Sequence, residues 1–199
     1  MIVIGLTGNL GTGKSTVARM LVDLGAAHIE ADSIGHELLS RESVHAEILS
    51  TFGTGITGID GQIDRQKLGK LVFSDSSVRE KLNAIMHPAI REEAQRRIDD
   101  YRAQGKKAVI LEAALFFEAE WEPMVDQIWV AYAPREKAVK RVKANRGMTE
   151  DDALSRLQAQ MPMKEKMARA DAVIDTDCSL KDLKRRVGYL WEQLVTPLL

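Results

Sequence analysis

A glycine-rich segment follows the first apolar run of this chain and severely limits the folds it can adopt. Residues 8–15, Gly-Asn-Leu-Gly-Thr-Gly-Lys-Ser, fit the pattern G-x-x-x-x-G-K-[ST] at every position, and the apolar residues 2–6 before them are typical of a strand. Glycines let backbone N–H groups curl around phosphate oxygens, and a following helix points its positive end at the same anion. The pattern therefore predicts a phosphate-binding loop, and a protein that binds a nucleoside triphosphate.

The polar residues of this loop have separate chemical roles. Lys14 is expected to reach the outer phosphates as a point charge, and the Ser15 hydroxyl is expected to ligate Mg²⁺. The predicted nucleotide contacts cover most of the loop: Gly8, Gly11, Thr12, Gly13, Lys14, Ser15 and Thr16.

Short apolar runs separated by helical patterns predict an α/β fold. A helix is expected at 14–24, ended by Gly25, and four more strands at 26–30, 108–111, 127–131 and 172–175. Continuous apolar runs are typical of parallel strands that are covered on both faces. We predict a parallel sheet of about five strands flanked by helices, with the phosphate loop at its first strand-to-helix turn.

Two helical regions are expected to interrupt this sheet. The predicted division is a nucleotide-binding core (1–31, 105–134 and 170–199), a helical acceptor-binding insertion (32–104) and a helical lid (135–169). The last segment carries ten basic residues against five acidic ones in a chain whose net charge is −1. Two interpretations stay open for it: a lid whose arginines close over polyphosphate, or a solvated helix face.

Composition and missing motifs narrow the function. With 28 basic and 29 acidic residues, no overall field attracts nucleic acid or a membrane surface. A single cysteine and the lack of a signal peptide or a membrane-length apolar run favour the cytoplasm. No N-K-x-D motif for guanine is present. A small kinase that acts on a small molecule is the natural interpretation, either as a monomer or as a small homo-oligomer.

The whole chain resembles dephospho-CoA kinases, members of the P-loop kinases. Residues 4–18, which include the phosphate loop, resemble the opening of that family. Further matches follow in family order: Leu24-Gly25, Glu30-Ala31-Asp32, Phe52-Gly53, 61–68, Val72-Phe73, His87-Pro88, Ile90, 115–118, Gln160, Glu165-Lys166, Ala170-Asp171 and 173–175. The resemblance implies transfer of the ATP γ-phosphate to the ribose 3′-hydroxyl of dephospho-CoA, with Mg²⁺, as the last step of CoA biosynthesis.

Three residues outside the loop are candidates for catalysis or metal binding. Asp32 follows the second strand and is expected to act as general base and to hold Mg²⁺, unless it only caps the next helix. Arg141 matches the family's first lid arginine, which would stabilise the transferring phosphoryl group. Glu112 ends the third strand, where the family usually has Asp. It is expected either to organise the metal or to form a structural pair with an arginine.

The acceptor is expected to contact His87 and Arg91, because the family places this segment in its acceptor domain, and Arg65 is a further candidate for an acceptor contact. For His87 a purely structural role stays open, and Pro88 favours a helix start there. Asp64-Arg65 could instead begin a helix. The chain departs from the family at Glu112-Ala113-Ala114, Ala138 and Asn145, although Arg146 could substitute in the lid. These departures leave two alternatives: a kinase for another acceptor, and a nucleotide-binding regulator without catalysis.

Overall fold

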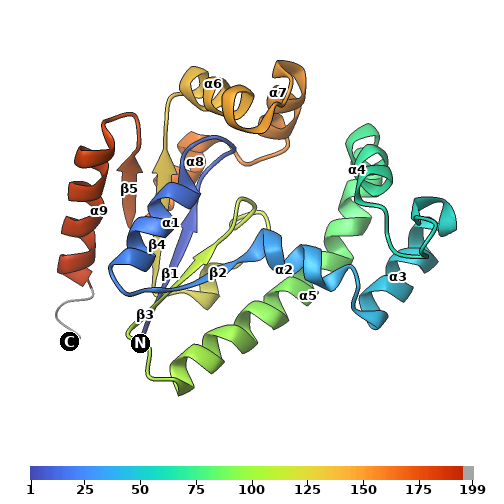
Figure 1. The fold of residues 1–199 in the computed structure, drawn as a ribbon, viewed down its shortest axis with the longest axis horizontal. Coiled ribbons are helices and arrows are strands. Elements are labelled where there is room, and N and C mark those ends of the chain that lie inside the picture. Colours follow the sequence, from blue (N-terminus) through green and yellow to red (C-terminus); the bar gives the residue numbers. More distant parts are fainter. Residues whose placement is uncertain (195–199) are drawn as a thin grey trace. The chain divides into compact units, whose positions relative to one another are not determined.

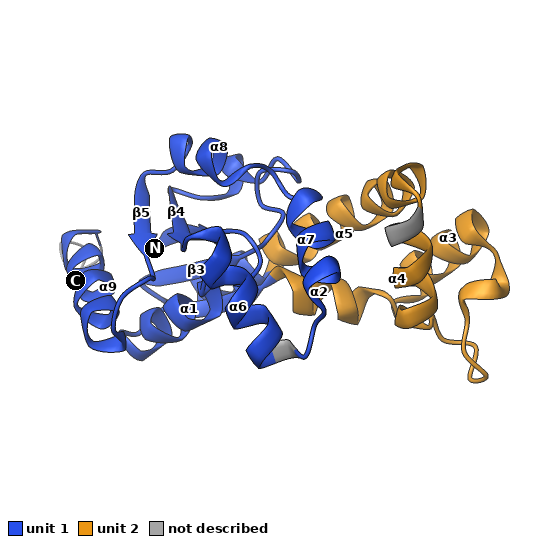
Figure 2. Ribbon diagram, turned by 90° about the horizontal axis from the view of Figure 1, so that it is seen from above, with its two compact units in different colours: residues 1–30, 97–199 blue, residues 31–96 orange. Residues whose placement is uncertain are grey.

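A computed structural model describes residues 1–194 of this chain, apart from the side chains of Phe73, Ser74 and Arg146. The chain forms two compact units, one made of residues 1–30 and the chain from residue 97 on, and one made of residues 31–96 (Figure 2). The first unit contains the sheet, and the second is helical.

The sheet of the first unit has five strands in the order β2-β3-β1-β4-β5, and all neighbours pair in parallel (Figure 1). The strands are β1 (Ile2–Thr7), β2 (Ala27–Glu30), β3 (Ala108–Glu112), β4 (Gln127–Tyr132) and β5 (Ala172–Asp175). In the central strand, Ile4 pairs with Ile110 on one side and Gln127 on the other. The predicted parallel sheet and its strand positions are confirmed.

Helices flank this sheet on both faces. The helical elements of the first unit are α1 (Lys14–Asp23), α6 (Arg135–Arg146), α7 (Glu150–Gln158), α8 (Met163–Ala168), α9 (Leu180–Leu194) and the last part of α5 (Ser76–Ala103), with a short 3₁₀ turn η2 (Glu122–Met124). α1 and α9 pack together on one face through a core that includes Leu21, Val187 and Trp191 (Figure 1). On the other face Phe116 lies so close to Gly5 that a Cβ there would be 2.7 Å from its ring.

The helix after the phosphate loop ends as the sequence predicts. α1 runs from Lys14 to Asp23, and Gly25 follows with a φ of 106°, a conformation that favours glycine. The chain then turns directly into β2.

The second unit consists of α2 (Ala31–Leu38), α3 (Glu42–Phe52), the 3₁₀ turn η1 (Thr54–Ile56), α4 (Arg65–Ser74) and the first part of α5. Asp64 begins α4 by accepting hydrogen bonds from the backbone N–H groups of Gln66 and Lys67, so the predicted helix start is confirmed. The helix start predicted at Pro88 is wrong, because Pro88 lies inside α5. The helix continues on both sides of it and buries Met86 and Ala94, which offsets the loss of one backbone hydrogen bond.

Among residues 1–194, no helix is both long and apolar enough to cross a bilayer.

Candidate functional site: a nucleotide cleft at the phosphate loop

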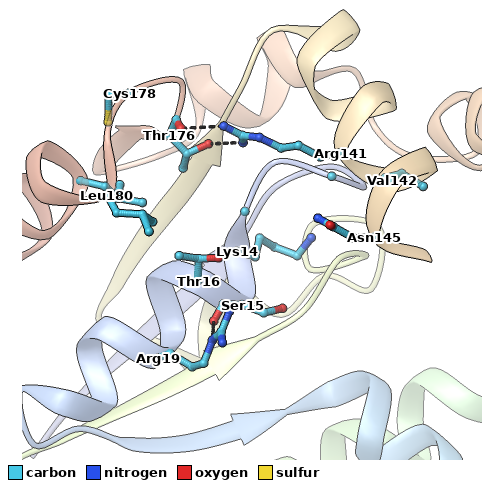
Figure 3. A pocket seen from close by; sticks show the side chains of 13 residues that line it. Lys14, Ser15, Thr16, Arg19, Arg141, Val142, Asn145, Thr176, Cys178 and Leu180 are labelled. Atoms are coloured by element: carbon cyan, nitrogen blue, oxygen red, sulfur yellow. Dashed lines mark hydrogen bonds between the residues drawn. The ribbon is translucent and has the colours of Figure 1, made fainter. Parts of the chain in front are cut away.

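A cleft of about 440 Å³ opens beside the phosphate loop within the first unit (Figure 3). The loop and the start of α1 form one wall, α6 forms another, and the chain after β5 closes it. Its described lining includes three basic side chains and no acidic one: Lys14, Arg19 and Arg141. A concave site with this charge suits a polyphosphate.

Glycines shape the loop because other elements approach its backbone closely. Gly8 has a φ of 145°, and a Cβ there would lie 2.3 Å from the backbone oxygen of Ala131. Gly11 has a φ of 79°, and a Cβ there would lie 2.3 Å from the backbone oxygen of Ala138 on α6. Both positions therefore require glycine, and α6 rests directly on the loop.

Hydrogen bonds hold Lys14 and Ser15, the loop residues that are expected to contact phosphate and metal. The Lys14 Nζ donates to the backbone oxygens of Gly8 at 2.7 Å and Asn9 at 3.4 Å, so the ammonium lies across the mouth of the loop. The Ser15 Oγ donates to Oε1 of Glu112 at 2.9 Å. This bond joins the start of α1 to the carboxyl end of β3.

Glu112 is buried between two partners, and neither of them is an arginine. His28 pairs with Ile110 in the sheet register, so it lies diagonally across from Glu112 on the same face. Its Nε2 is 3.0 Å from Oε2 of Glu112. Burial raises the pKa of this carboxyl, but the hydrogen bonds from His28 and Ser15 and the charge of Lys14 lower it more. Glu112 is therefore a buried carboxylate that stays ionised.

Arg141 is fixed on the opposite side of the cleft. Its guanidinium donates to Oγ1 of Thr176 at 2.9 Å and to the backbone oxygen of the same residue at 2.8 Å (Figure 3). The Thr176 hydroxyl donates in turn to the backbone oxygen of Thr12 at 2.7 Å. One threonine thus connects the arginine of α6 to the phosphate loop.

The other predicted site residues lie in the second unit. Asp32 is exposed and lies in the first turn of α2, two residues after Glu30, whose Cα pairs with that of Glu112. Arg65, at the start of α4, has its Nη2 2.7 Å from Nε2 of His36. His87 and Arg91 lie one turn apart on α5. The structure thus gathers Lys14, Ser15, Glu112 and Arg141 around the loop, and places Asp32 and the predicted acceptor residues in the helical unit.

The departures from the family pattern have partial structural explanations. Asn145 lines the cleft, and the buried Ala138 supplies the backbone oxygen that lies against Gly11. The suggestion that Arg146 substitutes in the lid falls outside the described residues, because that side chain is not among them.

Sequence reasoning missed two residues that shape the site. The contact of His28 with Glu112 depends on the register in which β2 pairs with β3, which no local sequence pattern gives. Thr176 follows the last strand, and its bond to Thr12 spans 164 residues. For Thr176 the available signal was a polar residue directly after a predicted parallel strand, and for His28 it was a polar residue inside one.

The donors at the loop fit a magnesium ion. The Ser15 hydroxyl and the Glu112 carboxylate are oxygen ligands of the kind that Mg²⁺ prefers, and they are 2.9 Å apart. In the described part of the chain, no group of three or more His, Cys, Asp or Glu side chains could hold a metal. In phosphoryl-transfer enzymes, water and phosphate oxygens usually complete the coordination of Mg²⁺.

A central strand that leads into a phosphate loop, the strand order 2-3-1-4-5, and a basic helix over the loop define a P-loop kinase. The family model for dephospho-CoA kinase matches residues 2–182. Dephospho-CoA kinase from Geobacter sulfurreducens is 45% identical over 96% of this chain and 98% of its own. The chain belongs to the dephospho-CoA kinase family.

Solved structures agree with this assignment. A crystal structure of a Thermus thermophilus protein is 36% identical and superposes with a TM-score of 0.82, covering 97% of each chain. The structure of dephospho-CoA kinase from Campylobacter jejuni is 27% identical, with a TM-score of 0.73 over 99% of this chain and 98% of its own.

Proposed function

We propose that this chain transfers the γ-phosphate of ATP to the ribose 3′-hydroxyl of dephospho-CoA, releasing CoA and ADP. In this role it performs the last step of CoA biosynthesis, as its family membership implies. The observation that carries the proposal is the cleft in which the phosphate loop and Arg141 face each other (Figure 3).

The cleft provides for each part of ATP. The loop N–H groups and the helix N-terminus bind the phosphates, and Lys14 exchanges its backbone acceptors for the outer phosphate oxygens. Arg141 stabilises the charge on the transferring group. The apolar side chains of Leu180 and Leu183 line the same cleft and suit the flat face of the base.

In our proposal, Ser15, Glu112 and Asp32 hold the Mg²⁺ ion. Bound Mg²⁺ neutralises phosphate charge and aligns the β- and γ-phosphates. Glu112 is suited to this role because its partners keep it ionised although it is buried. The His28 imidazole orients the carboxylate so that Oε1 faces Ser15.

Asp32 acts as the general base. The 3′-hydroxyl oxygen forms a bond to the γ-phosphorus while the bond from that phosphorus to the β-phosphate oxygen breaks, and ADP leaves. The hydroxyl proton passes to the Asp32 carboxylate. Support for this role comes from its exposure and its position just after β2.

The helical unit provides the acceptor site in this proposal. Arg65, His87 and Arg91 contact dephospho-CoA, within an acceptor region that spans 32–104. Arginines match the charge of its pyrophosphate. Residues 135–169 serve as the lid, which is supported by the contact between α6 and Gly11.

The test is ADP release from the purified protein with ATP and Mg²⁺. Dephospho-CoA is compared with adenosine, AMP and shikimate as acceptors, and we expect rapid turnover with dephospho-CoA alone. Lys14→Ala should abolish this turnover and leave the circular dichroism spectrum unchanged. Preference for another acceptor would overturn the proposed substrate. ATP binding with no turnover for any acceptor would indicate a regulator instead.

A further inference from the structure

A short segment between α7 and α8 is bonded directly to the back of the phosphate loop. The side-chain oxygen Oε1 of Gln160 accepts the backbone N–H of Leu10 at 2.9 Å, across 150 residues of sequence. The neighbouring loop residue, Asn9, donates from Nδ2 to the backbone oxygen of Met161 at 3.4 Å. Two consecutive residues of the segment thus hold two consecutive residues of the loop.

The same segment is anchored on its other side by Glu118. This carboxylate accepts the Met161 N–H at 2.6 Å through Oε1. It also pairs with Lys166 of α8, whose Nζ is 3.0 Å from the same oxygen. One carboxylate therefore fixes both ends of the stretch from 161 to 166.

Lys166 makes this anchor unusually rigid. Its side chain is fully buried, and Nζ also donates to the backbone oxygen of Ala114 at 2.8 Å. A buried ammonium is costly unless its hydrogen bonds are made, so Lys166 can occupy this place only while Glu118 and Ala114 stay where they are. The support beneath Gln160 therefore depends on directional hydrogen bonds as well as on apolar packing.

Gln160 lies outside the described lining of the nucleotide cleft. It lines a second cavity of about 390 Å³, together with Asn9, Thr12 and Tyr132, and is not among the described residues that line the nucleotide cleft. Its contact is with a loop whose glycines at 8 and 11 have φ values of 145° and 79°. Glycines give this backbone conformational freedom. That freedom must be restricted before the N–H groups of the loop can converge on a phosphate.

We propose that Gln160 is a positioning residue of the phosphate loop, and that the Lys166–Glu118 pair is its fixed support. The inference deepens the proposed function and rests on it, because it requires that the cleft bind the phosphates of ATP. It also gives a role to Gln160 and Lys166, which match the family in order but make no contact with the described nucleotide cleft.

The test compares Gln160→Leu with wild type in binding ATP and inorganic tripolyphosphate, by isothermal titration calorimetry. Without its acceptor the Leu10 N–H loses its partner, and the loop spends less time in the binding conformation. We expect the dissociation constants of both ligands to rise about tenfold. Tripolyphosphate has no base, so an equal effect on both ligands locates the defect at the phosphates.

Gln193→Leu is the matched control, because Gln193 is exposed on α9 and should leave both constants unchanged. If Gln160→Leu does not fold, Gln160→Asn keeps the amide but is too short to reach Leu10, and should show the same loss. Unchanged affinities with a lowered melting temperature would reduce Gln160 to a structural residue and overturn the inference. Failure of wild type to bind ATP would instead overturn the proposed function.

Discussion

The two units of the molecule hold their candidate functional residues in different ways. In the sheet-containing unit, Ser15 and Arg141 each have a fixed partner at 2.9 Å or less, namely Glu112 and Thr176. In the helical unit, Arg65 lies 2.7 Å from His36, whereas the side chains of Asp32 and Arg91 are exposed. The candidate residues of the first unit are thus tied to its sheet and loop by hydrogen bonds, whereas two of those in the helical unit lie at the surface.

This difference has a consequence for mutations. A substitution in the first unit should disturb its hydrogen-bond network, and so alter how the protein binds and uses ATP and Mg²⁺. A change in the second unit should remove one contact or one proton acceptor, and leave ATP binding almost as it was. Kinetic constants for the two substrates can separate these cases.

Among the substitutions that separate the two units, the largest effect is expected from Asp32→Asn in the helical unit. The amide cannot accept the proton of the 3′-hydroxyl, so kcat should fall by about 10²- to 10⁴-fold. Asn is compatible with a helix start, so the fold should persist. The measurement is steady-state turnover with dephospho-CoA, together with the dissociation constant for ATP, which should change little.

Asp23→Asn is the control for this prediction, because Asp23 is an exposed carboxylate at the end of α1. It should keep the wild-type kcat. An Asp32→Asn enzyme with wild-type kcat would show that another group takes the proton.

The next largest effect is expected from Glu112→Gln in the sheet-containing unit. Gln has the same shape and can keep a hydrogen bond to Ser15, but it lacks the charge that organises a cation. We expect kcat at fixed Mg²⁺ to fall about 10- to 100-fold. The Mg²⁺ concentration that gives half-maximal rate should rise as well. Both are read from turnover over a range of Mg²⁺ concentrations.

Glu192→Gln is the matched control, since Glu192 is exposed on α9. The interpretation of Glu112 as a metal-organising acid would be lost if its variant followed the wild-type Mg²⁺ dependence.

Removal of Arg91 tests the acceptor side alone. If its guanidinium contacts a phosphate of dephospho-CoA, Arg91→Ala should raise KM for that substrate about tenfold, as expected for one charge-assisted hydrogen bond. KM for ATP should be unchanged. Equal increases in both constants would contradict the division of labour between the units.

The sequence predicted those parts of the molecule that local patterns determine. The loop motif and five apolar runs located β1 to β5 and α1 almost to the residue, because a buried parallel strand has a continuous apolar signature. The placement of Lys14 and Ser15 in a cleft follows from the same motif.

Contacts that depend on strand register or on distant segments could not be predicted. His28 meets Glu112 only because β2 pairs with β3 in one particular register. Thr176 and Gln160 reach the loop across more than a hundred residues. Pro88 is the opposite case. A local rule predicted a helix start at this residue, but the packing of α5 keeps the helix continuous through it.

Lys166 and Glu112 are both buried charged residues beside the same loop. The smallest of the expected effects comes from comparing how the first unit holds these two charges. For Glu112 the hydrogen bonds outweigh burial, so its pKa is lowered and the charged form is favoured. For Lys166 burial lowers the pKa more than the pairing with Glu118 raises it, so the equilibrium shifts toward the neutral form. Folding therefore favours release of the Lys166 proton at alkaline pH.

The sign of the resulting effect on stability is fixed by proton linkage. Between the lowered pKa of the folded state and the ordinary value of 10.5, the unfolded chain keeps this proton and the folded chain releases it. The free energy of unfolding of wild type should therefore rise with pH in that window, relative to Lys166→Met, by at most about 1.4 kcal/mol per pH unit. Urea unfolding of both proteins from pH 7 to 10 measures the difference. Lys164→Met, an exposed lysine on the same helix, should show no such slope. A difference that does not rise over this range would mean that pairing with Glu118 matches or outweighs burial, and that this anchor, like Glu112, is held in its charged form.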